Sequence, residues 1–224
     1  MKALAIFGST ARHEREASSD IDLIGLYDEV AVKSITEQSV SLFMYPEKKL
    51  VEMMTNGDLF ALHLVKEAQP IYGIEIFECI FSKFNYKENY QQEMNVSLYV
   101  ADYILKNYEM LKDYSEANKK LSWSLRTFII AVSAHDRKPV FSKVKISEYL
   151  SFPNLTSQDV LVAINVKIFK SKLPDSIMLK IKNIFSYLAE GNDSGRKCEM
   201  DIELASSIIK KIGIGYSGLF DSGR

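Results

Sequence analysis

The segment from residue 3 to residue 23 constrains the fold of this 224-residue chain more than any other. It opens with the apolar run Ala3-Leu4-Ala5-Ile6-Phe7, which stops at Gly8-Ser9 and is typical of a buried strand that ends in a tight turn. Residues 10–16 then suit one or two turns of helix, so we expect Ser9 at a strand-to-helix junction. Backbone N–H groups at a helix start, together with a serine hydroxyl, can bind phosphate oxygens. The turn therefore indicates a phosphate site with a geometry that suits a triphosphate.

Two carboxylates lie at the start of the next predicted strand. Asp20 and Asp22 are two residues apart and project from one face of that strand, whereas Ile21 and Leu23 point to the other. Two carboxylates held this close repel each other unless a cation lies between them. Mg²⁺ prefers hard oxygen ligands and binds substrate phosphates as well. The sequence therefore predicts a magnesium site at Asp20 and Asp22, close to the phosphate turn.

The spacing of these residues resembles the signature of the DNA polymerase β-like nucleotidyltransferase superfamily. That signature is Gly-Ser, a gap of ten residues and then Asp-x-Asp, and here residues 10–19 fill the gap. The flanks are similar to those of the bacterial branch, in which Ala-Arg-Gly-Glu commonly follows Gly-Ser-x and Ser-Asp-Ile-Asp-Leu closes the motif. This chain has Ala-Arg-His-Glu at residues 11–14, so it departs from the pattern at His13.

The resemblance implies a fold, an activity and a set of binding residues. The fold is α+β, with a small mixed β-sheet nucleotidyltransferase domain and flanking helices followed by an all-helical bundle. The activity is magnesium-dependent transfer of a nucleoside monophosphate from a nucleoside triphosphate, with ATP as the expected donor, and release of pyrophosphate. Asp20 and Asp22 would be the catalytic, metal-binding residues. Gly8 and Ser9 would hold the triphosphate, and Arg12 would neutralise phosphate charge.

The family's third carboxylate has no clear counterpart. The run from Ser39 to Tyr45 alternates as a strand, and the resemblance would place the third acid near Ser41. A serine hydroxyl cannot neutralise a cation, and the flanking residues Glu37 and Glu47 are the candidate substitutes. In two-metal transfer this ligand supports the ion that activates the attacking oxygen. Two hypotheses stay open: an active enzyme, or a catalytically impaired nucleotide-binding protein of a regulatory or antitoxin-like kind.

Strand signals are concentrated before residue 46, and helical periodicity dominates after it. We therefore predict a catalytic domain at residues 1–86 and a helical domain at residues 87–224. The expected helices lie at about 46–54, 57–68, 93–113, 116–134, 142–150, 157–170, 175–190 and 200–211. In the family such a helical domain commonly selects the acceptor, which is a small molecule, a tRNA end or a partner protein; this sequence does not say which.

Composition limits the location and the partners. The N-terminal apolar run is too short for a secretion signal, and no segment is long enough to span a membrane. Cys79 and Cys198 are far apart and form no paired motif, which favours free thiols in a reducing cytoplasm. Residues 1–80 have a net charge of −6 and residues 81–224 one of +5, far from the balance of a dedicated nucleic-acid-binding protein. We expect a cytoplasmic protein with no membrane partner, and the oligomeric state stays open.

Overall fold

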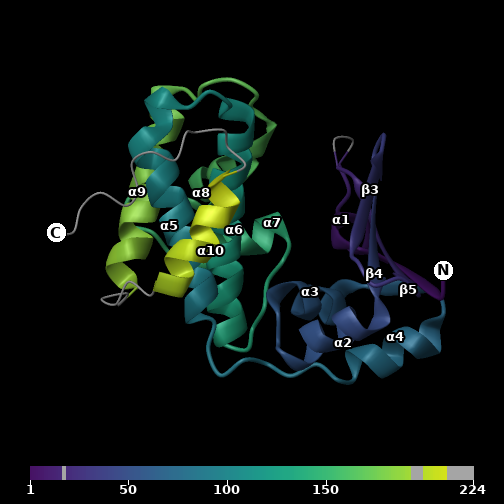
Figure 1. Ribbon diagram of the computed structural model, residues 1–224. Coiled ribbons are helices and arrows are strands. Elements are labelled where there is room, and N and C mark those ends of the chain that lie inside the picture. Colours follow the sequence, from purple (N-terminus) through teal and green to yellow (C-terminus); the bar gives the residue numbers. More distant parts are fainter. Residues whose placement is uncertain (17–18, 193–198, 211–224) are drawn as a thin grey trace. The chain divides into compact units, whose positions relative to one another are not determined.

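The computed structural model describes residues 1–16, 19–192 and 199–210. The chain divides into two compact units, one from Met1 to Asn89 and one that begins at Tyr90. The first unit combines a β-sheet with helices, and the described part of the second consists mainly of helices (Figure 1). The protein is therefore α+β, as the sequence predicts at the coarse level.

The first unit contains a five-stranded sheet with the strand order β3-β4-β2-β1-β5. The strands are β1 (Ala3–Phe7), β2 (Ile21–Tyr27), β3 (Lys33–Glu37), β4 (Val40–Pro46) and β5 (Gln69–Tyr72). β2 and β4 run parallel and the other neighbours run antiparallel, so the sheet is mixed. The sequence did not predict β3 and β5. All residues of β3 are exposed and β5 is very short, so neither shows the alternation of a half-buried strand.

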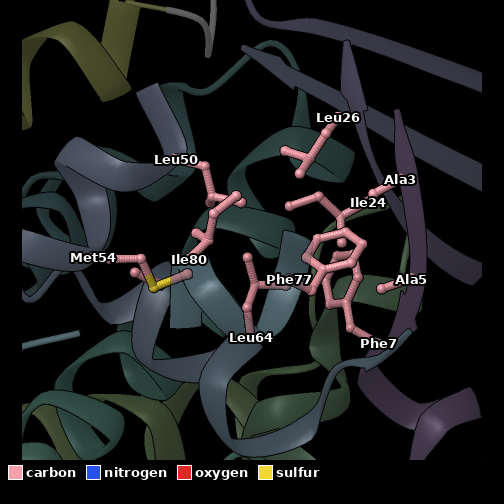
Figure 2. Packing of buried hydrophobic residues seen from close by; sticks show 11 residues of the cluster. Ala3, Ala5, Phe7, Ile24, Leu26, Leu50, Met54, Leu64, Phe77 and Ile80 are labelled. Carbon is pink, nitrogen blue, oxygen red and sulfur yellow. The ribbon is translucent and has the colours of Figure 1, made fainter. Parts of the chain in front are cut away.

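Three helices cover one face of this sheet: α2 (Glu47–Thr55), α3 (Leu59–Glu67) and α4 (Ile74–Phe81). α2 and α3 lie where the periodicity predicts them. The core cluster consists of Ala3, Ala5, Phe7, Ile24 and Leu26 from the strands and Leu50, Met54, Ala61, Leu64, Phe77 and Ile80 from the helices. Figure 2 shows the strand side chains pointing toward those of the helices. Burying each large apolar side chain contributes about 1.5–3 kcal/mol, so this cluster sets the position of β1 and β2.

The second unit contains the remaining helices. They are α5 (Gln91–Asn107), η1 (Tyr108–Met110), α6 (Tyr114–His135), α7 (Lys143–Tyr149), α8 (Ser157–Asn165), η2 (Val166–Ile168), α9 (Asp175–Gly191) and α10 (Glu199–Ile209). The predicted helices at 93–113 and 157–170 each end in a short 3₁₀ turn, because tighter hydrogen bonding commonly closes the last turn of a helix. The predicted end of the last helix at Lys211 lies outside the described residues.

A buried network of hydrogen bonds connects three segments of the second unit. The hydroxyl of Tyr108 donates to Oδ1 of Asn118 at 2.7 Å and accepts the backbone N–H of Leu173 at 3.0 Å. Nδ2 of Asn118 in turn donates to the carbonyl oxygens of Phe169 and Ser171, both at 3.0 Å. Burial raises the pKa of the Tyr108 hydroxyl, so it stays protonated and keeps this donor role at neutral pH.

Candidate functional site

The turn after β1 brings Gly8 against Asp22. Gly8 has a φ of +72°, a conformation that residues with a side chain rarely adopt. A Cβ atom built on Gly8 would lie 2.8 Å from Oδ2 of Asp22, which is closer than van der Waals contact. Glycine is therefore needed at this position for two independent reasons. The carboxylate of Asp22 lies directly beside the turn that the sequence predicts to bind phosphate.

The helix after this turn is shorter than predicted. α1 covers only Gly8–Ala11, and the N–H of Arg12 closes it by donating to the carbonyl of Gly8 at 3.2 Å. His13 then adopts a φ of +60°, which ends the helix. The expected helix at residues 10–16 is thus a single turn that includes Ser9. Because one turn has only a small dipole, a phosphate here would depend on individual N–H and hydroxyl groups.

The two carboxylates lie where β2 begins. Asp22 is the second residue of β2 and pairs with Phe7 of β1. Asp20 is exposed and immediately precedes the strand. Alternation along β2 sets the face from which the Asp22 side chain projects. Asp20 lies just before the strand, and the shared face of the two carboxylates stays a prediction. In the parallel ladder Asp22 also pairs with Ser41 of β4, so the Ser41 side chain belongs to that face as well.

Glu37 does not lie on the face that carries these carboxylates. In the antiparallel ladder between β3 and β4, Thr36 pairs with Ser41 and Glu37 with Val40. Thr36 therefore shares the face of Ser41, and their hydroxyl oxygens are 3.4 Å apart. Because adjacent residues of a strand point to opposite faces, the Glu37 side chain leaves from the other side of the sheet. A role for Glu37 as third ligand would require its side chain to cross the sheet.

Glu47 lies at the opposite end of the strands. It follows Pro46, which pairs with Tyr27 at the far end of β2. At about 3.3 Å per residue, Tyr27 is about 16 Å along the strand from Asp22. The carboxylate of Glu47 instead lies 3.6 Å from Nζ of Lys2. Neither substitute that the sequence left open is therefore beside Asp22. Among the described residues, no group of three or more His, Cys, Asp or Glu side chains could hold a metal ion.

Arg12 is held by two carboxylates. Its Nε donates to Glu14 at 2.8 Å, and its Nη1 donates to Oε2 of Glu67 at the end of α3. The same oxygen of Glu67 lies 2.7 Å from Nε2 of His63. The side chains of Arg12 and Glu67 are only 19% and 11% exposed, so solvent screens this contact weakly. A phosphate that bound Arg12 would compete with these two carboxylates for the positive charge of the guanidinium.

α3 and the residues after it also brace the turn. Nε2 of Gln69 donates to the carbonyl of Ala11 at 2.7 Å. The ring of His63 packs edge-on against Phe7, with ring centroids 5.6 Å apart. Phe7 and Ala11 flank the turn, so both of its ends are held from the same side. Glu67 and Gln69 lie more than 50 residues from the turn, so no local spacing in the sequence indicates that they support it.

Replacing Glu67 should destabilise the first unit more than replacing Glu14. Glu67→Gln leaves the guanidinium of Arg12 without its less exposed carboxylate, and hydrogen bonds to charged groups contribute about 1.5–3 kcal/mol. Glu14→Gln removes an exposed partner of the same guanidinium, for which a loss of less than about 1 kcal/mol is expected. Urea denaturation of the two variants measures the difference. Equal losses would show that Glu67 does not brace the turn.

No protein-family model matches the chain, and no curated protein sequence matches it. The function of the chain is therefore inferred from the motif and from the geometry around it. In the part of the chain that the structure describes, no helix is long and apolar enough to cross a membrane. Cys79 is exposed with a free thiol, and Cys198 lies outside the described residues.

Proposed function

We propose that the protein is a magnesium-dependent nucleotidyltransferase that transfers a nucleoside monophosphate, with ATP as the expected donor, to an acceptor hydroxyl or similar nucleophile. The observation that carries the proposal is the contact between the Gly8 turn and Asp22, where no side chain fits at Gly8 because a carboxylate oxygen is already there. Asp22 and the turn would need this adjacency to hold one metal ion and a phosphate together. The sheet supports the proposal, because Asp22 is the second residue of β2 and Asp20 immediately precedes that strand.

The residues present fit Mg²⁺. Proteins commonly bind this ion through one or two carboxylates, and water and substrate phosphates complete its shell. Asp20 and Asp22 supply two hard oxygen ligands beside a candidate phosphate turn. Bound there, Mg²⁺ would supply charge neutralisation for the triphosphate. The task of the chain is then to position the triphosphate and the acceptor rather than to form a covalent intermediate.

The phosphate side of the site involves Ser9, Thr10 and Arg12. We assign the Ser9 hydroxyl and the N–H groups of the turn to the triphosphate oxygens. The Thr10 hydroxyl oxygen is buried and has no hydrogen-bond partner in the described residues. Because buried polar groups nearly always have a partner, this supports a ligand or water oxygen at the turn. Arg12 adds positive charge, which Glu14 and Glu67 partly offset.

A second candidate function is nucleotide binding without efficient transfer. The observation that favours it is the register of β2 and β4, which pairs Asp22 with Ser41 where the resemblance expects an acid. Without a third carboxylate, support for a second ion is weaker, and activation of the acceptor suffers more than triphosphate binding. Such a protein would use the phosphate turn and the carboxylate pair as a nucleotide sensor or docking surface.

The variant Ser41→Asp separates the two candidates. If the missing acid limits turnover, magnesium-dependent pyrophosphate release should rise at least about tenfold, because a second ion can contribute several kcal/mol and 1.4 kcal/mol is tenfold. The assay uses ATP with small-molecule, tRNA and protein acceptors. Thr36→Asp is the matched control, since Thr36 shares the face but lies one strand further from Asp22.

Pyrophosphate release and calorimetric titration of ATP together have three results that lead to different conclusions. Pyrophosphate release by the wild-type protein supports the transferase. Magnesium-dependent ATP binding without release in the wild type and in Ser41→Asp supports the binding protein. Absence of magnesium-dependent triphosphate binding in the wild type contradicts both proposals.

A further inference from the structure

One edge of the sheet is open to solvent. β3 is an edge strand, its neighbour in the sheet is β4, and all of its residues are exposed. Ile35 at its centre is 53% exposed, and Val30 and Val32 in the preceding loop are 97% and 44% exposed. An edge strand offers a row of backbone N–H and C=O groups, and here apolar side chains accompany it. Such an edge is a template for pairing with another strand.

The side chains of β3 are complementary to themselves. The strand reads Lys33-Ser34-Ile35-Thr36-Glu37, with opposite charges at its two ends. When two copies pair antiparallel about Ile35, Lys33 of each copy lies opposite Glu37 of the other, and the two Ile35 side chains meet. Opposite charges and apolar side chains that face each other across strands both stabilise pairing. The pattern therefore fits a twofold contact between identical strands.

The backbone has the alternation that this pairing needs. A two-residue turn at Gln38 and Ser39 joins β3 to β4, and Glu37 pairs with Val40 next to it. The pair beside such a turn is hydrogen-bonded, and bonded and non-bonded pairs then alternate along the ladder. Ser34 and Thr36 therefore direct their N–H and C=O groups away from β4. These two residues flank Ile35 and can exchange hydrogen bonds with their counterparts in a second copy.

We propose that β3 pairs antiparallel with β3 of a second copy of this chain, so that one sheet continues across a twofold homodimer. The charges select this arrangement, because parallel pairing in register sets Lys33 beside Lys33 and Glu37 beside Glu37. Within its own chain Lys33 contacts Glu29, but both side chains are largely exposed, so this pair contributes little and can exchange. The proposal does not depend on the proposed function, since no residue of β3 belongs to the phosphate turn or the carboxylate pair.

Charge reversal at the two ends of β3 tests the proposal by sedimentation equilibrium of the full chain, from about 1 μM to about 1 mM. The contact is small, so the wild-type dimer should be weak and concentration-dependent. Lys33→Glu and Glu37→Lys should each weaken self-association at least tenfold. In a dimer of either variant, residues 33 and 37 carry the same charge and lie opposite each other across the two strands. An equimolar mixture of the two should form a heterodimer, since all four end residues then face opposite charges. Lys48→Glu, on the exposed side of α2, is the control.

A backbone variant gives an independent readout. Ser34→Pro removes an N–H group that faces away from β4, and proline is tolerated on edge strands. It should abolish dimerisation while circular dichroism and the melting temperature stay near the wild-type values. A wild-type protein that stays monomeric over the whole range contradicts the proposal. So does a dimer that both charge variants retain, or a mixture of the two variants that does not associate.

Discussion

Replacing both Asp20 and Asp22 by Asn should abolish magnesium-dependent triphosphate binding, with a loss in affinity of about 100-fold or more. The two carboxylates are the hard oxygen ligands of the proposed site, and neutral amides attract a divalent cation far less strongly. Asn has nearly the same shape as Asp, so the fold should persist. Removal of two neighbouring like charges even relieves repulsion in the metal-free protein. Calorimetric titration of ATP with and without Mg²⁺ measures the effect.

The glutamates that the structure places elsewhere provide the controls for this experiment. Glu37→Gln and Glu47→Gln remove one charge each, but these side chains lie on the other face and at the far end of the strands. Both variants should bind magnesium and triphosphate as the wild type does. Unchanged affinity in the Asp20→Asn/Asp22→Asn protein would place the metal elsewhere and remove the basis of the proposed function.

Gly8→Val should be the most damaging single substitution at the site. Valine is β-branched and would have to adopt a φ of +72°, which costs about 1–3 kcal/mol. Its Cβ would also overlap Oδ2 of Asp22, and such overpacking costs a further 1–3 kcal/mol or so. We expect the free energy of unfolding to fall by about 2–5 kcal/mol, and triphosphate affinity to fall more than in Ser9→Ala. Urea denaturation and calorimetry measure the two effects.

Gly191 is the matched control for this substitution. It is the last residue of α9, its φ lies outside the left-handed region, and nothing lies within 4 Å of a Cβ built there. Gly191→Ala should be neutral or slightly stabilising, because alanine favours helix more than glycine does. If Gly8→Val were as stable as Gly191→Ala, the contact between the turn and Asp22 could not have the geometry described.

The predictions that succeeded used local periodicity. β1, β2 and β4 have apolar residues that alternate or run together, and α2 and α3 have apolar residues three and four positions apart. β3 and β5 were not predicted, because strands can pair along exposed or very short segments that carry no such pattern. Helix ends were predicted less well, since a 3₁₀ turn and an α-helical turn have nearly the same sequence preferences.

For the candidate site, the local sequence predicted the turn at Gly8 and the strand that carries Asp22, and the structure brings these two residues into contact. This was possible because a strand has a period of two and only a short connection joins the two strands. The membership of Ser9 and Asp20 in the site stays a prediction. The support from Glu67 and the position of Ser41 could not be predicted in this way. They depend on which strands pair and in what register, and on where α3 packs.

The sequence by itself therefore determined the α+β class, the turn at Gly8 and the strand that carries Asp22, because each follows from neighbours along the chain. The tertiary structure alone decided that Asp22 fills the space beside Gly8, that Ser41 rather than Glu37 or Glu47 lies next to Asp22, and that Glu67 holds Arg12. These are contacts between segments far apart in sequence. Their geometry is set by sheet register and by burial of the apolar cluster, which no local pattern encodes.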